Sequence, residues 1–426
     1  MIKKFLPSGD ISKNISILVV GTFMAQLIPV LLQSVLRRVY PAEVFGVYEV
    51  FISITGMLMV IAALRYEMAV VLPDKRGDAV NLVFTGLFAS LLFNTLLFFT
   101  INLFRENILS FLNLEPQYGY MLNYLPFAIF FFSSYQVFNY FLVRHKSYTA
   151  VSVNKISRRV SEGALQVGLG LGGRFGTGLI WGNIIGHATT FITGWFQMLR
   201  AGFSLRLFSL KRQWQLAIRY REFPLVNLIP ALLNSICMHL PLILVMKFFD
   251  LETTAHFGLA RQVLVLPSSI ITLSISQVLL QTISEKSRAN QNIFSDLKRI
   301  VVLLFIPAVA MTVLIFLWAP PLFALYAGSE YFISGIYAQI IVPGAALKLM
   351  VVPVSSVFIA LKKIKLFSIW QAGYFLMISS LFFMENLQIE TFLKVYLTID
   401  MVAYGVMLLL IFYITSNYEN KRKNLG

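Results

Sequence analysis

Charged residues that lie inside long apolar runs are the residues of this chain best suited to bind a ligand. Arg65 and Glu67 stand within the apolar stretch 47–72 and not at its ends. A charge at the centre of a membrane-spanning helix costs on the order of 2.5–3.5 kcal/mol on insertion scales, so it must face protein, a water-filled cavity or a ligand. Because the two residues are two positions apart, we expect them on different helix faces. Each then needs its own partner, in a structural salt bridge or a functional contact.

A second group of charges follows one face of the expected helix 150–172. Its polar positions recur at the three- and four-residue spacing of a helical face, and they are Lys155, Arg158, Arg159, Glu162 and Gln166. Such a face cannot meet lipid. Lys155 and Arg158 lie near the predicted cytoplasmic end, where they either extend to the membrane surface or line a cavity. Arg159 and Glu162 lie deeper and are predicted to line a cavity.

Three further charges fall within apolar runs in the second half of the chain. Arg261 lies just inside the predicted periplasmic end of the run 257–282, where it is either interfacial or faces a cavity. Lys348 and Asp400 lie near the middle of their runs. No acid lies within a helical turn of Lys348, so a ligand or a distant acid must neutralise it. Asp400 either pairs with Lys348 across the bundle or carries a proton or ion.

The balance of these charges is positive. Seven cations stand against the three acids Glu67, Glu162 and Asp400. The cations are Arg65, Lys155, Arg158, Arg159, Arg261, Lys348 and Lys394. This surplus favours an anionic substrate, and the first six cations are our candidate substrate-binding residues. The three acids are candidates for structural pairing or for coupling to H⁺ or Na⁺, and no spacing decides between these roles.

The composition excludes a soluble protein. Apolar residues make up 58% of the 426 residues, charged residues make up 13%, and the mean hydropathy is +0.76. These values are typical of a polytopic helical membrane protein. The single cysteine excludes a disulfide within one chain, and the four histidines lack metal-ligand spacing. We therefore predict no metal site, no cofactor and no catalytic residue. The net charge of +16 lies mainly in short loops, which indicates membrane topology rather than nucleic-acid binding.

Twelve apolar runs approach the length of about 20 residues that a membrane span needs. They lie near 15–35, 47–72, 79–103, 119–143, 150–172, 176–199, 224–248, 257–282, 299–325, 333–360, 366–384 and 391–414. With the N-terminus in the cytoplasm, the inside segments hold 23 Lys and Arg, and the outside loops hold five. Those five are Arg37, Arg38, Arg105, Arg174 and Lys247. This asymmetry predicts twelve membrane-spanning helices with both termini in the cytoplasm.

An internal repeat divides the chain at its middle. Pro29 and Pro241 stand in similar apolar segments, and each precedes a Phe-Gly pair, at residues 45–46 and 257–258. The prolines and the glycines share one offset of 212 residues. We therefore predict a parallel repeat of two six-helix bundles, with substrate bound between them. The predicted parts are an N-terminal bundle, an amphipathic cytoplasmic connector, a C-terminal bundle and a cytoplasmic tail, at residues 1–199, 200–223, 224–415 and 416–426.

Four short motifs resemble those of a known family. They are the turn Leu-Arg-Arg-Val-Tyr-Pro-Ala-Glu-Val-Phe-Gly-Val-Tyr at 36–48, Ala-Leu-Arg-Tyr-Glu-Met-Ala-Val-Val-Leu-Pro at 63–73, Arg-Glu-Phe-Pro-Leu at 221–225 and Gln-Val-Leu-Val-Leu-Pro at 262–267. Together with the length, the span count and the repeat, they resemble the polysaccharide transport family. This is the family of Wzx-type flippases in the MOP (multidrug/oligosaccharidyl-lipid/polysaccharide) superfamily.

The resemblance implies a flippase of the bacterial inner membrane. Such a protein carries an undecaprenyl-diphosphate-linked oligosaccharide from the cytoplasmic to the periplasmic leaflet, for O-antigen (lipopolysaccharide), capsule or exopolysaccharide synthesis. It implies a V-shaped transporter with a cationic central cavity and alternating access, for which Arg65 and Arg261 are candidates. The implied partners are the lipid-linked oligosaccharide, membrane lipids, a polysaccharide polymerase and other assembly proteins.

Other classes of membrane protein would require other sequence features. A proton- or sodium-coupled drug or metabolite antiporter of the same superfamily would need acids to dominate the N-terminal half. A lipid II flippase usually has two further C-terminal helices. A major facilitator transporter would need a loop motif that residues 73–78 do not match. A membrane enzyme would need acidic motifs in large outside loops, and the loop 104–118 has only two acids.

Overall fold

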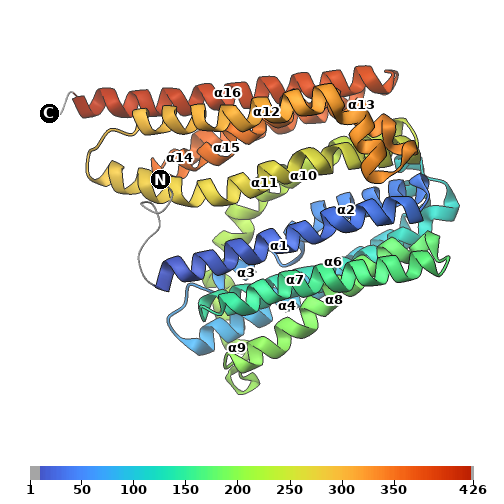
Figure 1. Cartoon of the computed structure of the whole chain (residues 1–426). Helices are drawn as coiled ribbons and strands as arrows, with labels where there is room; N and C mark the ends of the chain where they lie inside the picture. The colour runs from blue at the N-terminus through green and yellow to red at the C-terminus, as the bar shows by residue number, and fades with distance from the viewer. Residues whose placement is uncertain (1–9, 424–426) are drawn as a thin grey trace. The chain divides into compact units, whose positions relative to one another are not determined.

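The computed structural model describes residues 10–423, and every regular element in that range is a helix (Figure 1). A long helix lies at each of the twelve predicted spans. These helices are α1 (Asp10–Val39), α2 (Ala42–Ala62), α4 (Arg76–Leu103), α6 (Tyr120–Arg144), α7 (Tyr148–Leu171), α8 (Phe175–Arg200), α10 (Leu228–Phe248), α11 (Leu251–Arg288), α12 (Phe294–Ala327), α13 (Phe332–Val351), α15 (Ile364–Ser379) and α16 (Ile389–Lys423). The prediction of an all-α chain is confirmed.

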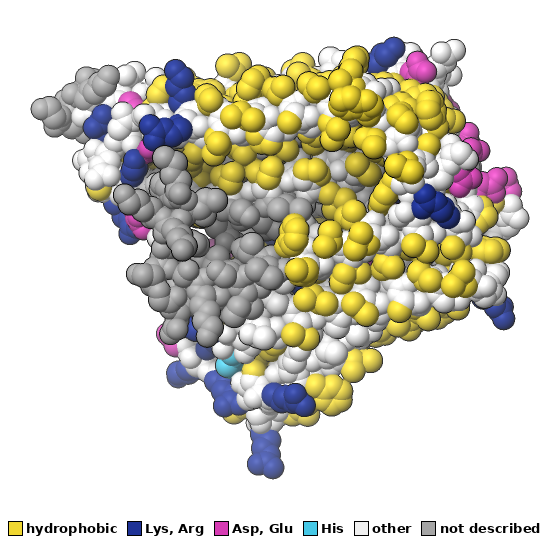
Figure 2. Space-filling model, viewed as in Figure 1, with side chains coloured by type: hydrophobic (Ala, Val, Ile, Leu, Met, Phe, Trp, Pro, Cys, Tyr) yellow, Lys and Arg dark blue, Asp and Glu magenta, His cyan; other side chains and the backbone are white. Residues whose placement is uncertain are grey.

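Many of these helices are suited to a membrane. In the described range, eight segments are long and apolar enough to cross one, and they contain α2, α4, α6, α10, α12, α13, α15 and α16. In the view of Figure 2, hydrophobic side chains cover much of the surface, and Lys and Arg gather toward its margins. The chain is therefore a multi-pass membrane protein. The count of twelve crossings stays a prediction, because α1, α7, α8 and α11 are not among the eight.

The second predicted span is not one continuous helix, so the prediction of a single helix over 47–72 is wrong. Helix α2 ends at Ala62, and α3 (Tyr66–Ala69) begins after a turn in which Leu64 and Arg65 have φ angles of 52° and 63°. Left-handed backbone costs a non-glycine residue roughly 1–2 kcal/mol. No glycine or proline marks this turn, so contacts from neighbouring helices must hold it. The span 333–360 is also interrupted, where Pro353 begins a 3-10 turn.

The described residues form two compact units, one ending at Ala255 and the other beginning at His256, inside α11. Helix α10 belongs to the first unit and packs against α2. There Ser235 donates a hydrogen bond of 2.8 Å from its Oγ to the Gly56 carbonyl oxygen. We refer to the two as the N-terminal and C-terminal units. The predicted domain boundaries at 199, 223 and 415 remain predictions.

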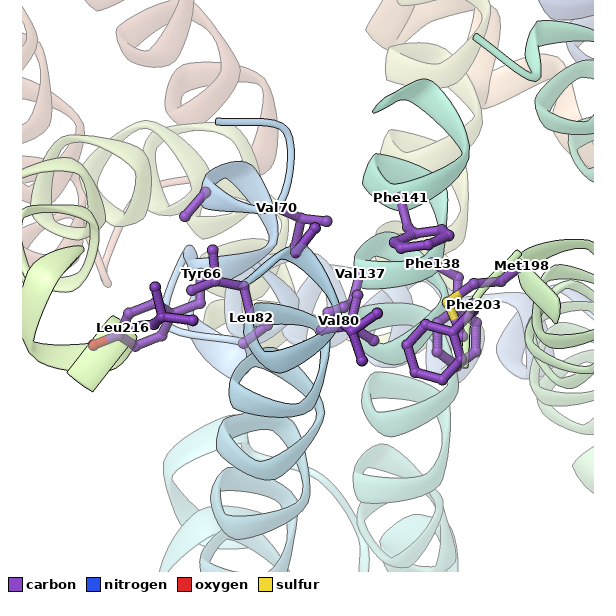
Figure 3. Packing of buried hydrophobic residues seen from close by; sticks show 14 residues of the cluster. Tyr66, Val70, Val80, Leu82, Val137, Phe138, Phe141, Met198, Phe203 and Leu216 are labelled. Carbon is purple, nitrogen blue, oxygen red and sulfur yellow. The ribbon is translucent and has the colours of Figure 1, made fainter. Parts of the chain in front are cut away.

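A buried hydrophobic cluster holds the segment that follows Arg65 in the N-terminal unit. It joins side chains from α3, α4, α6 and α8 with Phe203 and Leu216 (Figure 3). Tyr66 and Val70 belong to this cluster, and Val70 is fully buried. The cluster therefore sets the position of the backbone immediately after the left-handed turn.

The predicted amphipathic connector contains a helix, α9 (Leu210–Arg219), that is bonded to α4. Arg212 forms two hydrogen bonds of 2.7 Å with the two carboxylate oxygens of Asp78, and these bonds raise the pKa of the arginine. Asn81 donates to the Leu207 carbonyl oxygen (2.9 Å) and accepts from the Ser209 amide (2.8 Å). The outer face of α9 exposes three apolar side chains at four-residue spacing, and they are Leu210, Trp214 and Ile218. This pattern is typical of a helix at a membrane surface.

Glycines allow α8 to approach α7 closely. A Cβ atom at Gly186 would lie 2.9 Å from the Glu162 Cβ, and one at Gly182 would lie 2.9 Å from the Glu162 carbonyl oxygen. Small residues at helix contacts let two backbones pack at short distance. Glu162 and Gln166, on the polar face of α7, therefore pack against α8.

We expect Gly182→Ala to destabilise the protein, because the new methyl group would collide with α7 backbone, and overpacking costs typically about 1–3 kcal/mol. The thermal unfolding midpoint in detergent should fall. Gly373→Ala in α15 is the matched control, because a Cβ there meets no atom within 4 Å. It should leave the midpoint unchanged or raise it. Equal midpoints for both variants would contradict the close packing of α7 and α8.

Candidate functional site

Arg65 and Glu67 contact each other, so the prediction that they face apart is wrong. The Arg65 Nη1 and Glu67 Oε1 atoms are 3.7 Å apart, and the two side chains are 26% and 9% exposed. The helical spacing rule fails here because Arg65 lies in the left-handed turn before α3. The contact is loose. Arg65 Nε and Glu67 Oε2 are both buried and have no hydrogen-bond partner in the described part of the chain.

The backbone around this pair is held from two sides. Tyr66 donates a hydrogen bond of 3.0 Å from its hydroxyl to the Ala217 carbonyl oxygen of α9. Arg144, at the end of α6, donates to the carbonyl oxygens of Val71 (3.3 Å) and Asp74 (3.1 Å). The Arg65 guanidinium therefore projects from a fixed backbone while keeping unused hydrogen-bonding capacity. A fixed backbone with unused hydrogen-bonding groups suits ligand binding, because ordering the site costs little free energy when the ligand binds.

Glu162 is the centre of a polar network between α2, α7 and α8. Its Oε2 accepts from Arg159 Nη1 at 2.9 Å, and Arg158 Nε lies 3.7 Å from the same oxygen. Its Oε1 accepts from the Tyr48 hydroxyl (3.2 Å) and from Asn183 Nδ2 (2.9 Å). Both carboxylate oxygens are therefore occupied by protein. This geometry favours structural pairing for Glu162, and two arginines sharing one carboxylate leave a local positive charge.

Lys155 reaches another helix and not an acid. Its Nζ donates a hydrogen bond of 2.8 Å to the Thr22 hydroxyl of α1. The neighbouring Asn154 is buried and donates to Gln197 Oε1 of α8 at 2.6 Å. Near its N-terminal end, α7 is thus hydrogen-bonded to both α1 and α8. The two predicted alternatives for Lys155, surface and cavity, both remain open.

Arg37 and His187 are among the buried polar residues of the N-terminal unit that the sequence did not indicate as site residues. The sequence predicts Arg37 in an outside loop, but the residue lies in the last turn of α1 and is fully buried. It donates to Glu49 Oε1 (3.0 Å) and to the Ala255 carbonyl oxygen (3.2 Å), and its guanidinium lies 3.8 Å from the Phe45 ring centroid. His187 of α8 is also buried. The sequence does carry one indication of each. A polar residue stands four positions earlier on the same helix face, Gln33 before Arg37 and Asn183 before His187.

The predicted pair of Lys348 and Asp400 is present in the C-terminal unit. The Lys348 Nζ lies 2.6 Å from Asp400 Oδ2, joining α13 to α16. The other oxygen, Oδ1, accepts from the Tyr374 hydroxyl of α15 at 2.8 Å. The Tyr396 and Tyr404 rings lie 5.5 and 5.2 Å from the same ammonium, a cation–π arrangement. Both residues are therefore satisfied inside this unit.

Arg261 lies on α11, with its guanidinium 5.5 Å from the Phe257 ring centroid. Apart from Arg261, the predicted site residues thus fall into three sets: Arg65 with Glu67, the charges of α7, and Lys348 with Asp400.

Among the residues that the structure describes, no group of three His, Cys, Asp or Glu side chains is arranged to hold a metal ion.

This chain resembles a known protein family in sequence and several solved membrane transporters in fold. A family model described as polysaccharide biosynthesis protein matches residues 35–334. An inward-facing multidrug resistance MATE family transporter of the MOP superfamily superimposes with a TM-score of 0.70 at 13% identity, over 94% of this chain and 96% of that one. The lipid II flippase MurJ, in an inward closed conformation, gives a TM-score of 0.74 at 12% identity, over 95% and 90%.

A MOP superfamily transporter from Pyrococcus furiosus gives a TM-score of 0.63 at 14% identity, over 96% of each chain. No curated protein matches the sequence. Similarity at these identities establishes the fold, which is that of MOP superfamily transporters. The fold class predicted from the sequence is thereby confirmed.

We expect Asp400→Asn to destabilise the C-terminal unit by about 3–5 kcal/mol, because it leaves the Lys348 ammonium buried without a counter-charge. The double variant Lys348→Met/Asp400→Leu removes both charges and should recover most of that loss. Thermal unfolding of the purified variants in detergent measures both effects. A stable Asp400→Asn protein that has lost transport would instead assign Asp400 to ion coupling.

Proposed function

We propose, from the premise that the chain belongs to the polysaccharide biosynthesis protein family, that it is a flippase for undecaprenyl-diphosphate-linked oligosaccharide. The resemblance inferred from short motifs agrees with that family membership. In this proposal the protein moves its substrate from the cytoplasmic to the periplasmic leaflet of a bacterial inner membrane by alternating access. The product serves O-antigen, capsule or exopolysaccharide synthesis.

The observation that carries the proposal is the incomplete pairing of Arg65. Its side chain is partly exposed. Among the described residues its one ion pair is 3.7 Å long and its Nε lacks a hydrogen-bond partner. A guanidinium can bind phosphate oxygens through two parallel hydrogen bonds. A diphosphate carries the negative charge that such a group and the surrounding cationic surplus favour.

Two further observations support a lipid-linked substrate at the inner membrane. One of the similar folds belongs to a lipid II flippase, whose substrate is a lipid. The excess of Lys and Arg in alternate loops supports cytoplasmic termini. With that orientation Arg65 lies near the cytoplasmic end of its span, where a headgroup arriving from the cytoplasm would first meet it.

An antiporter is the second candidate, because a MATE transporter shares the fold. Ion coupling in either function needs an acid that can gain and lose a cation. Glu162 and Asp400 have both carboxylate oxygens occupied by protein groups. Glu67 retains a buried oxygen without a partner in the described residues. We therefore assign ion coupling, by H⁺ or Na⁺, to Glu67.

We expect Arg65→Ala to abolish polysaccharide export, because the phosphate-binding group is lost, while protein level and membrane insertion stay normal. Lipid-linked oligosaccharide should accumulate at the cytoplasmic face of the membrane. Arg65→Lys should remain impaired if two parallel hydrogen bonds are needed. Arg174→Ala, at an exposed cation in a predicted outside loop, is the control and should export normally. Normal export by Arg65→Ala would remove Arg65 from the mechanism.

We expect Glu67→Gln to abolish the response of transport to an imposed H⁺ or Na⁺ gradient, because an amide does not exchange a cation. The measurement is substrate movement in sealed vesicles with and without the gradient. Glu115→Gln, an exposed acid outside the membrane helices, is the control. A gradient response that survives in Glu67→Gln would exclude this residue as the coupling group.

A further inference from the structure

A cavity of about 500 Å³ lies in the C-terminal unit, at the end where α14 (Val357–Ala360) turns into α15. Its walls come from α11, α14, α15, α16 and the turn at residues 361–363. The polar groups that line it include Lys362, Lys363, Asn417 and Tyr418. The volume falls within the range of small-molecule binding sites, roughly 300–1,000 Å³.

The two lysines bring positive charge that the neighbouring protein does not neutralise. Both side chains are exposed, and in the part of the chain that the structure describes neither forms a salt bridge. The turn itself is fixed, because the Lys362 amide bonds to the Ile359 carbonyl oxygen (3.0 Å) and the Lys363 amide to that of Phe358 (2.7 Å). Two consecutive lysines that line one cavity from a fixed turn favour an anion with several oxygens.

The rest of the cavity wall suits an amphiphile. Tyr413 is 63% exposed and presents an aromatic ring, and Leu366 adds an aliphatic surface. Tyr418 donates a hydrogen bond of 3.4 Å from its hydroxyl to the Ser287 carbonyl oxygen, which joins α16 to α11 in the cavity lining. Tyrosine at the level of lipid headgroups is typical of membrane proteins. Cationic and polar lining residues beside exposed apolar side chains match a headgroup that continues into acyl chains.

We propose that this cavity binds the phosphate headgroup of an anionic membrane phospholipid. Basic pockets between membrane helices on the cytoplasmic side bind such headgroups in general. The surrounding Lys and Arg predict a cytoplasmic position for this end of the unit. The site shares no residue with the Arg65 site and does not depend on the identity of the transported substrate.

Lipid binding to the purified full-length protein tests the proposal, by native mass spectrometry with phosphatidylglycerol and with phosphatidylcholine. Lys362→Gln/Lys363→Gln should weaken phosphatidylglycerol binding by about tenfold or more and leave phosphatidylcholine binding unchanged. The matched control is Lys298→Gln/Lys365→Gln, which removes two exposed lysines outside the cavity lining. Equal losses in both double variants would show general surface attraction and overturn the site.

A second variant tests the cavity without removing charge. Ala360 lines the cavity, so Ala360→Phe should narrow it and weaken phosphatidylglycerol binding while both lysines remain. Inorganic phosphate that competes fully with the lipid at low millimolar concentration would show a site for free phosphate and overturn the lipid assignment. Arg65→Ala should bind phosphatidylglycerol normally, so the failure of this proposal and that of the flippase proposal are distinguishable.

Discussion

A charged side chain in hydrocarbon has no water to stabilise it, and this constraint organises the polar interior of both units. Glu162 is satisfied by groups from α2, α7 and α8 together. Asp400 is satisfied by groups from α13 and α15. Each carboxylate thus gathers helices that apolar packing alone would hold less specifically, since lipid and leucine are equally apolar. In each unit a buried carboxylate thus joins three helices.

The pair of Arg65 and Glu67 stands apart from this pattern. It lies on a backbone held by Tyr66 and Arg144, yet both of its side chains keep a buried atom without a partner in the described residues. A satisfied ion pair would gain little from a ligand, because each new contact would replace an old one. An incompletely bonded ion pair on a fixed backbone gains favourable contacts when a phosphate or a cation binds to it. This contrast distinguishes the Glu67 carboxylate from those of Glu162 and Asp400, whereas Arg158 shares with Arg65 a buried Nε that has no partner among the described residues.

Much of the fold could be predicted from the sequence, because membrane spans follow from apolar length. Lys348 and Asp400 could be paired from the sequence because neither has an opposite charge within one turn on its own helix. The turn at Leu64 and Arg65 could not be predicted, since nothing in its sequence marks a left-handed backbone, and packing against α4, α6 and α9 holds it. Arg37 could not be placed, because one of its partners is a backbone carbonyl, and a carbonyl has no signature in the sequence.

The turn at Arg65 also bears on how the chain enters the membrane. Helix α2 has 21 residues, which at 1.5 Å per residue gives about 32 Å, close to the thickness of the hydrocarbon layer. During synthesis the insertion machinery therefore receives a helix without basic residues that is long enough to cross by itself, and the arginine follows at its edge. The 21 residues of α2 can therefore meet the length requirement of a membrane crossing without including the Arg65 charge.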